Sequence, residues 1–576
     1  MNNFYRIACA VPECRTADIS FNIGEMIKLY AEAAQNRASI VLFPSEAVSG
    51  FACGELPHFP LFARKEAEAV EQLARATAKY ETIAVLTDSD GNIIVASNGS
   101  FDIADSRDTV FTNGDLRFAV SPEREAFAPA GRNRGVHLML FPYAQFDTYH
   151  TVKERRTDYS ALSRSLKCFC AACGAGASNS TSAGVCAGHA LVAFDGKVTA
   201  ENRQFERKSQ ILYSDIDIEE AETFFNRDLR FWHEDMAGVH VNIPQIKELE
   251  YCTISKYPFI PEEDTKEYSD SIILTSAAAL ANRMITSRSK TMVLGVSGGL
   301  DSTMALITCV ECCRMMGVSE KNIVAVSMPG FGTSDRTRDN SLAIAEEFGV
   351  ELKYIPISSA VTQHFEDIGH DPANTDVVYE NSQARERTQI LMDIANGCGG
   401  IVIGTGDLSE IALGWCTYNG DQMSMYAVNA SIPKTLMRKV ISCYAEKQSG
   451  KLAEKLIDIC DTPVSPELVP GKQFTEEIIG SYDLHDFFIY WFIKYGAAPA
   501  KLYQMACRAF KDDYAPGQIL SALEVFFRRF FVSQFKRSAM PDSPDVTGIN
   551  LSSFSMPSDA SGKVWNDEIE ILKKQL

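Results

Sequence analysis

The sequence predicts an α/β protein of two units, the second of which contains a doubly wound parallel sheet. The chain has 576 residues, too many for one hydrophobic core. Apolar runs typical of buried strands alternate with segments of helical period along the whole chain. An acidic stretch with two prolines, residues 246–268, predicts a linker between domains at 1–245 and 269–576.

Short strands alternate with helical segments in the first region. The segment Asn22–Asn36 has the apolar spacing of an amphipathic helix. Apolar and alternating runs predict its strands, which are Tyr5–Ala10, Ile40–Phe43, Thr82–Leu86, Ile93–Ala96, Leu116–Val120, His137–Phe141 and His189–Phe194. A layered α/β domain is therefore expected.

The second region begins with an expected helix, Ile272–Ile285. Its expected strands are Met292–Val296, Asn322–Ser327, Leu352–Ile357 and Ile401–Gly404, and the helices between them are Ser302–Cys312, Asp339–Phe348 and Gln383–Asn396. Strict alternation predicts a parallel sheet with ligands beyond the carboxyl ends of its strands. Four more helices are expected at Met437–Cys443, Phe487–Ile493, Leu502–Phe510 and Ile519–Phe535, followed by a loop, Ser538–Ala560, that covers a ligand or another subunit.

The composition is that of an ordinary globular protein, with 46% hydrophobic and 23% charged residues. A net charge of −20 disfavours nucleic acid as a partner, since phosphate backbones bind basic surfaces. The sequence lacks an apolar stretch near the ~20 residues of a membrane helix, and its start lacks the pattern of a signal peptide. We therefore expect neither nucleic acid nor membrane as a partner.

The 16 cysteines are scattered rather than dense, which favours a reducing cytoplasm. Cys168, Cys170 and Cys173 are closely spaced but have no matched second pair. Buried free thiols and a zinc site are both compatible with this spacing, and the missing pair favours thiols.

The string TMVLGVSGGLDST gives the strongest indication of chemistry. Its glycines fall between an expected strand and an expected helix, where unpaired amides bind anions. Gly298 and Gly299 allow the backbone to approach a phosphate closely. Ser297 and Ser302 can add hydroxyl donors, and Asp301 can supply an oxygen ligand for Mg²⁺. We expect a polyphosphate–Mg²⁺ site, the alternative being a turn that only joins strand to helix.

No Lys follows these glycines, so the string is not a GxxxxGK[ST] loop. Its SGGxDS form resembles the pyrophosphate loop of the N-type ATP pyrophosphatases. That resemblance implies a domain in which a substrate oxygen attacks the α-phosphorus of ATP, giving an adenylate and pyrophosphate.

The stretch Glu380–Thr435 resembles the NAD⁺ synthetases through ENSQARER, TGDLSEIALGWCTYNGD and PKT. The resemblance implies that Glu410 joins Asp301 as a ligand of Mg²⁺. It implies further ATP contacts from Thr405, Lys434 and Ser465. It also implies deamido-NAD⁺ contacts from Arg385, Asp421 and Lys536.

Three residues depart from the small synthetases of that family. Asp407 replaces the usual Asn, Tyr418 replaces a substrate-binding Lys, and Phe535 replaces a His. Neither the change at Asp407 nor that at Tyr418 removes a charge that adenylation requires.

The first region resembles the nitrilase superfamily through RIACAVPECRTADISFNIGEMI, ASIVLFPSEAVSGF, GVHLMLFPYAQFD and CFCAACGAGASNSTSAGVCAGHALVAFDGKV. The resemblance implies an α-β-β-α sandwich. In members fused to a synthetase, a Glu-Lys-Cys set hydrolyses glutamine.

This chain departs from that set at all three places. Ser45 stands where the Glu is required, and strand alternation is expected to turn its neighbour Glu46 to the other face. Ser121 stands where the Cys is required, and Asn92–Asp115 contains no Lys. A serine without a base is a far poorer nucleophile than a thiolate, so we expect no glutaminase. The alternative is that Glu46 or another acid acts as the base, with a later cysteine as nucleophile.

These resemblances imply ATP-dependent amidation of deamido-NAD⁺ through an acyl-adenylate, with ATP and Mg²⁺ as cofactors. Ammonia is the expected nitrogen donor, either free or supplied by a separate glutaminase, and the family implies a homo-oligomer. Three alternatives remain, which are a synthetase with an unrecognised glutaminase site, a different adenylating amidotransferase, and a non-catalytic partner protein.

Overall fold

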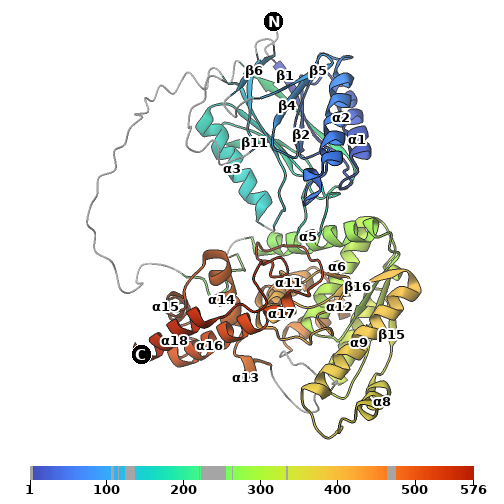
Figure 1. Cartoon of the computed structure of the whole chain (residues 1–576), viewed down its shortest axis with the longest axis vertical. Coiled ribbons are helices and arrows are strands. Elements are labelled where there is room, and N and C mark those ends of the chain that lie inside the picture. The colour runs from blue at the N-terminus through green and yellow to red at the C-terminus, as the bar shows by residue number, and fades with distance from the viewer. Residues whose placement is uncertain are drawn as a thin grey trace. The chain divides into compact units, whose positions relative to one another are not determined.

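The computed structural model describes residues 4–104, 109–113, 116–122, 136–148, 150–218, 221, 254–261, 264–332, 335–462 and 475–575. The chain divides into two compact units (Figure 1). The first comprises Met1–Ser180 and Gly184–Ile243, and the second Thr181–Ala183 and Pro244–Leu576.

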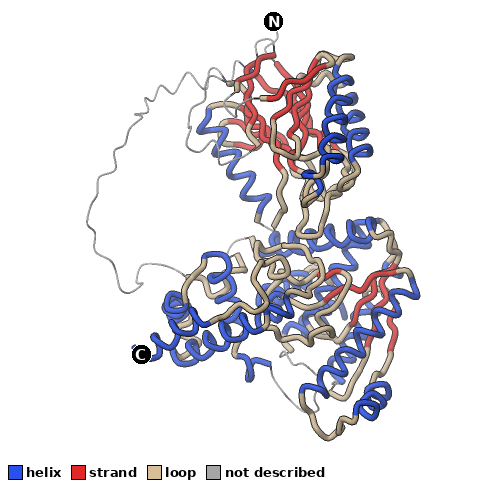
Figure 2. The backbone as a smooth tube through the Cα atoms, viewed as in Figure 1, coloured by secondary structure: helices blue, strands red, loops and turns tan. Residues whose placement is uncertain are grey.

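The first unit contains two six-stranded sheets (Figure 2). One has the order β12 (Gln210–Asp217), β1 (Phe4–Val11), β2 (Ile40–Ser45), β3 (Ile83–Thr87), β4 (Ile93–Ser97) and β5 (Ser100–Ile103). The other has the order β11 (Lys197–Glu201), β10 (Ala190–Phe194), β9 (Phe169–Gly174), β8 (Leu138–Tyr143), β7 (Leu116–Val120) and β6 (Val110–Asn113). In each sheet three strands run parallel, namely β1–β3 and β7–β9, and the flanking strands pair antiparallel.

Alternation along the strands builds a layered core. Ile7 and Cys9 of β1 point into the cluster between the two sheets, whereas Ala8 packs toward the helices. The helical layers are α1 (Ile19–Gln35), η1 (Leu56–His58) and α2 (Pro60–Thr77) on one sheet and α3 (Thr151–Leu166) on the other. The predicted α-β-β-α sandwich is confirmed.

The three closely spaced cysteines do not converge. Cys168 and Cys170 lie in the cluster under α3, whereas Cys173 lies in the cluster between the sheets. All three thiols are free and buried.

The second unit contains a five-stranded parallel sheet, confirming the predicted doubly wound fold. Its order is β15 (Glu351–Tyr354), β14 (Ile323–Ser327), β13 (Thr291–Gly295), β16 (Gly400–Gly404) and β17 (Tyr426–Ala427). The strand order reverses at β13, and such a reversal opens a ligand crevice beyond the carboxyl ends.

Helices cover both faces of this sheet. Val293 of β13 packs in the cluster that includes residues of α9, so alternation places Met292 toward the other face. The described helices of the second unit are α5 (Thr265–Thr286), α6 (Leu300–Met316), η3 (Glu320–Asn322), α7 (Asp335–Glu347), α8 (Ser358–Ile368), α9 (Val377–Cys398), α10 (Leu408–Leu413), α11 (Lys434–Ala445), α12 (Gly450–Cys460), α13 (Thr475–Ile479), α14 (Tyr482–Tyr495), α15 (Pro499–Ala509), α16 (Pro516–Val532), α17 (Gln534–Arg537) and α18 (Lys563–Gln575). Helices α14, α15, α16 and α18 pack on one another.

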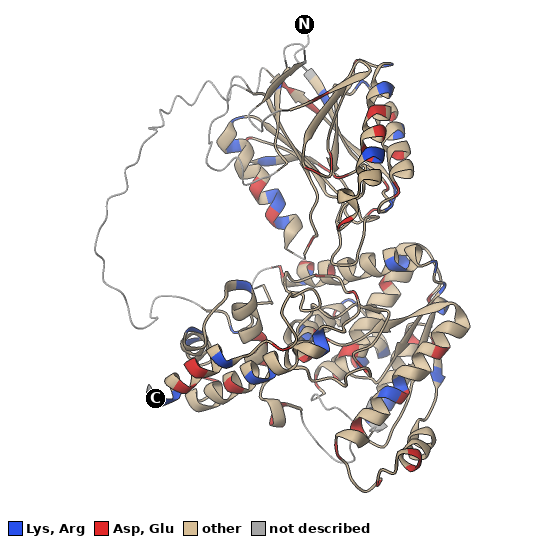
Figure 3. Cartoon of the chain, viewed as in Figure 1, with Lys and Arg blue, Asp and Glu red and all other residues tan. Residues whose placement is uncertain are grey.

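Helix α5 begins at Thr265, inside the stretch expected to be a linker, and residues 246–253 and 262–263 lie outside the described part. Both signs of charge alternate along the outer face of α2, where Arg64 and Lys65 pair with Glu68 (Figure 3). Within the described residues, helices long enough to cross a bilayer lack the necessary apolar character.

Candidate active site at the carboxyl end of the parallel sheet

The glycine loop lies directly after β13 and opens α6. Gly298 has φ of +82°, a left-handed conformation that favours glycine, and Gly299 is the extended N-cap residue of α6. The hydroxyls of Ser297 and Ser302 lie 3.3 Å apart across the loop, and Ser297 Oγ accepts from the amide of Gly299 at 3.3 Å. The first amides of α6 have no intrahelical partners and can bind an anion here.

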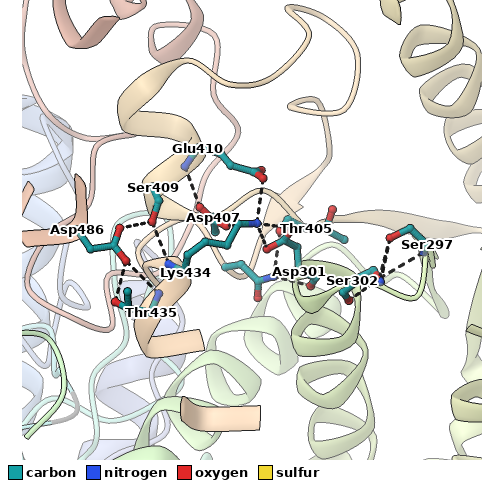
Figure 4. A network of polar contacts seen from close by, with 12 residues as sticks. Ser297, Asp301, Ser302, Thr405, Asp407, Ser409, Glu410, Lys434, Thr435 and Asp486 are labelled. Carbon is teal, nitrogen blue, oxygen red and sulfur yellow. Dashed lines mark hydrogen bonds and ion pairs between the residues drawn. The ribbon is translucent and has the colours of Figure 1, made fainter. Parts of the chain in front are cut away.

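Three carboxylates surround one ammonium group beside this loop (Figure 4). Lys434 Nζ lies 2.6 Å from both carboxylate oxygens of Asp301, 2.7 Å from Asp407 Oδ2 and 2.9 Å from Glu410 Oε1. Only 3% of the Lys434 side chain is exposed. The cluster thus unites the N-termini of α6, α10 and α11, and it brings together Asp301, Glu410 and Lys434, the three residues for which the sequence predicted metal or ATP contacts.

Burial shapes the electrostatics of this cluster. It raises the pKa of Asp407 well above its usual value, although Lys434 opposes the shift. Burial likewise raises the pKa of Glu410 to about 7. Burial alone would lower the pKa of Lys434, but Asp301, Asp407 and Glu410 together raise it. When all four groups are charged the cluster carries a formal charge of −2, which suits a divalent cation.

The donor set fits Mg²⁺. Asp301, Asp407 and Glu410 each offer an oxygen, and these oxygens lie within 4.8 Å of one another. Asp407 is fully buried, yet its Oδ2 receives no well-directed hydrogen bond and so has bonding capacity to spare. Carboxylate oxygens are the ligands that Mg²⁺ prefers. The sequence predicted Asp301 and Glu410 as ligands, and Asp407 stood out only as a departure from the usual Asn. An Asp three residues before a Glu is a signal for a helix start, and Asp407 Oδ1 does cap α10 by accepting from the amide of Glu410 at 2.8 Å.

A second buried acid supports the cluster from outside it. Asp486 of α14 accepts hydrogen bonds from Ser409 and Thr435, the neighbours of Glu410 and Lys434 (Figure 4). Asn429 bridges the loops by donating to the backbone oxygens of Asp301 and Thr405, at 2.8 and 3.0 Å. None of these supporting side chains was predicted from the sequence.

The three residues expected to bind deamido-NAD⁺ meet at one loop, which runs from Gly414 to Asp421. Asp421 belongs to the loop itself, whereas Arg385 reaches it from α9 and Lys536 from α17. Arg385 donates to Tyr418 O at 3.3 Å, and Lys536 Nζ donates to the carbonyls of Gly414 and Cys416 at 2.8 and 2.6 Å. Asp421 accepts from the amide of Thr417 at 2.6 Å. Ser465 lies outside the described residues.

The first unit places serines at the two expected positions. Ser45 ends β2, and Ser121 is fully buried directly after β7. Glu46 lies beyond the strand with φ of +56°, so the expected argument from strand alternation does not apply to it. Burial, with a contribution from Glu66, raises the pKa of Glu46.

The cysteines of the first unit are all buried within its described part. Burial raises the pKa of Cys14 to about 12, and it also raises the pKa of Cys53, Cys170, Cys173 and Cys186. A catalytic cysteine requires the opposite shift, because the thiolate is the nucleophile.

Comparison with known proteins agrees with this geometry. A family model described as NAD synthase matches residues 272–503. The glutamine-dependent NAD(+) synthetase of Mycobacterium leprae is 34% identical over 512 residues, covering 79% of this chain and 73% of that protein. The protein of the same name from Mycobacterium tuberculosis is 33% identical over 466 residues, covering 72% and 68%.

Two solved structures share the fold. The glutamine-dependent NAD(+) synthetase of Cytophaga hutchinsonii matches with a TM-score of 0.76 at 17% identity, covering 99% of this chain and 100% of its own. The Acinetobacter baumannii synthetase, in complex with ADP, matches with a TM-score of 0.63 at 18% identity, covering 98% and 100%. The chain therefore belongs to the glutamine-dependent NAD(+) synthetases, a family of ligases.

Proposed function

We propose that this synthetase converts deamido-NAD⁺ to NAD⁺ by adenylating its nicotinate carboxylate and that ammonia, rather than glutamine, supplies the nitrogen. The observation that carries the proposal is the group of Asp301, Asp407 and Glu410 around Lys434, beside the glycine loop. A carboxylate resists amines until it is activated. Attack of its oxygen on the α-phosphorus of ATP gives an acyl-adenylate and releases pyrophosphate.

Each group of the cluster has a place in that reaction. Mg²⁺, held by Asp301, Asp407 and Glu410, would neutralise charge on the phosphates of ATP. Lys434 stays protonated beside its carboxylates and offers a positive charge to the departing pyrophosphate. The free amides at the start of α6 bind phosphate oxygens. Ammonia then attacks the activated carbonyl, a proton leaves the nitrogen, and AMP departs with the electrons of the broken C–O bond.

The first unit supports ammonia as the donor. Glutamine hydrolysis needs a nucleophile that a base has activated, and the two key positions hold Ser45 and Ser121. Raised thiol pKa values in this unit disfavour a substitute cysteine. We propose that this unit has no glutaminase activity.

The test is to incubate the purified protein with deamido-NAD⁺, ATP and Mg²⁺, supplying either an ammonium salt or glutamine. We expect NAD⁺ and equimolar pyrophosphate with ammonium, and neither NAD⁺ nor glutamate with glutamine. Asp301→Asn should abolish the reaction, whereas Asp270→Asn, at an exposed ion pair with Lys447, serves as the control. Equal NAD⁺ formation from glutamine would refute ammonia dependence. Pyrophosphate release with another carboxylate but not with deamido-NAD⁺ would refute the substrate.

A further inference from the structure

We propose that Asp486 is a positioning residue for the adenylation site, fixing Lys434 relative to Glu410. The inference rests on the proposed function, because it concerns the same cluster. Asp486 is 1% exposed and lies on α14, a helix that contributes no carboxylate to the cluster, although the ring of its first residue, Tyr482, lies 5.7 Å from Lys434 Nζ. Its chain position is 51 residues from Thr435 and 77 from Ser409.

The carboxylate of Asp486 receives three hydrogen bonds from two other helices. Its Oδ1 accepts from the hydroxyl of Ser409 on α10. Its Oδ2 accepts from the amide of Thr435 at 3.0 Å and from the hydroxyl of Thr435 at 2.7 Å. Ser409 Oγ in turn accepts from the amide of Lys434 at 2.9 Å.

These contacts compensate for a missing cap. The first amides of a helix lack intrahelical partners, and the N-cap residue of α11 is Pro433, which has no side chain that can accept their hydrogen bonds. Asp486 accepts from the amide of Thr435 directly and from that of Lys434 through Ser409. Its negative charge also lies at the positive end of the α11 dipole. Asp486 therefore performs the capping of α11 from a third helix.

The consequence concerns geometry at the metal-binding groups. Ser409 immediately precedes Glu410, and Thr435 immediately follows Lys434. One rigid carboxylate therefore sets the distance between the residue that would bind Mg²⁺ and the residue that would meet the pyrophosphate. Misplacement of such groups by about 1 Å can cost on the order of 10²-fold in rate.

The main test is Asp486→Asn, which keeps the shape but removes one acceptor. With ammonium as donor we expect kcat to fall on the order of 10²-fold and the Mg²⁺ concentration for half-maximal rate to rise several-fold, while KM for ammonium stays unchanged. A loss of folded protein alone would lower the apparent kcat without moving the Mg²⁺ dependence. Asp18→Asn is the matched control, because Asp18 caps α1 in the first unit by accepting from the amide of Phe21 at 3.1 Å, outside this network.

Ser409→Ala provides a second route to the same conclusion. It should shift the Mg²⁺ dependence in the same direction, and Asp486→Asn should have a smaller effect in the Ser409→Ala background than in the wild type. Unchanged kcat and Mg²⁺ dependence in a folded Asp486→Asn variant would overturn the proposal. If that variant does not fold, Ser409→Ala decides by the same criteria. A wild-type protein that forms no NAD⁺ from deamido-NAD⁺ would instead overturn the proposed function.

Discussion

Lys434 occupies the position among three carboxylates that a metal ion would favour. An ammonium and Mg²⁺ compete for the same oxygens, so the lysine keeps Asp301, Asp407 and Glu410 together before the nucleotide arrives. Without a cation, like charges at this spacing would repel one another in a poorly solvated site. On the proposed function the lysine has two roles, as a counterion in the free protein and as a phosphate ligand in the reaction.

Lys434→Ala should separate these two roles. We expect kcat/KM for ATP to fall by roughly 10²–10³-fold, as for other lost groups that stabilise developing charge. The same variant should bind Mg²⁺ more tightly than the wild type when ATP is absent, since the competing ammonium is gone. Steady-state kinetics and calorimetric titration with Mg²⁺ measure the two effects.

The control for this variant is Lys447→Ala, which removes an exposed ion pair with Asp270 just beyond α11. It should leave both measurements unchanged. Weaker Mg²⁺ binding to the Lys434→Ala protein would contradict competition between the ammonium and the metal.

Sequence reasoning found the residues whose neighbours along the chain identify them. Asp301 and Glu410 stand in short strings that begin helices after strands, so both their place and their chemistry were legible. Asp486 stands alone among aromatic residues in LHDFFIYW. Its partners are distant in the chain, and only the packing of three helices brings them together.

At the scale of elements, the glycine loop depends on a backbone that other residues rarely adopt. Gly298, at its centre, has φ of +82°, and Gly317, at the far end of α6, has φ of +67°. An added Cβ at Gly317 would meet no atom within 4 Å, so only the backbone conformation opposes a side chain there. Gly298 and Gly317 therefore lie just outside the two ends of α6, and both have left-handed backbone.

Gly298→Ala and Gly317→Ala should each cost about 1 kcal/mol of backbone strain. Only Gly298→Ala should also raise KM for ATP, because it alters the amides that we propose bind phosphate. Melting temperatures and ATP kinetics of both variants test this distinction. An equal rise in KM for Gly317→Ala would show that the effect comes from α6 stability instead.

Helix α14 carries two neighbouring groups whose titrations oppose each other. Burial raises the pKa of Asp486 to about 6, so the folded protein keeps a proton that the unfolded chain loses above about 4. That contribution to stability is present below about pH 4 and is lost as pH rises through 6. Burial lowers the pKa of His485 to about 4, so its contribution is present above about pH 6.5 and is lost as pH falls through 4.

Variants of these two residues should therefore respond to pH with opposite sign. The melting temperature difference between wild type and Asp486→Asn should grow as pH falls from 6 to 4. The difference between wild type and His485→Gln should shrink over the same range. Tryptophan fluorescence can follow melting of the second unit, which contains Trp415, Trp491 and Trp565. Parallel trends in the two variants would contradict this assignment.

Some elements that were not predicted from the sequence had a readable pattern, among them the amphipathic helix α2 and the buried strand β9. Two others share a physical cause. Strand β5 is mostly exposed at a sheet edge and lacks apolar alternation, and helix α3 has a largely polar sequence. Strand Leu352–Ile357 was expected to end later than β15, because the apolar run continues beyond Tyr354. The amide of Ile355 still donates to Ser327 O of β14 at 2.9 Å, but the strand ladder itself ends at Tyr354. The spacing of apolar residues along the chain can identify segments with a continuous buried face. Edge strands and polar helices are instead stabilised by neighbours that are distant in the chain.

At the scale of the whole molecule, the proposed function combines an adenylation cluster in the second unit with a sandwich that has no glutaminase activity. A synthetase that hydrolyses its own glutamine can pass ammonia internally. An added enzyme that consumes free ammonia in solution, an ammonia trap, then has little effect on NAD⁺ formation. If Ser45 and Ser121 replace the catalytic pair, as we propose, nitrogen has to enter from solvent as ammonia. The two routes for ammonia differ in whether removing free ammonia from solution stops NAD⁺ formation.

With glutamine and an added, unrelated glutaminase, we expect NAD⁺ to form at the rate given by the ammonia released. Adding glutamate dehydrogenase, 2-oxoglutarate and NADPH should then reduce NAD⁺ formation to background, because free ammonia is consumed first. Ser121→Ala should behave like the wild type throughout, since Ser121 activates no glutamine. NAD⁺ formation that persists in the trap would mean that ammonia reaches the adenylate without entering solvent, and the first unit would then have to contain a working hydrolytic site.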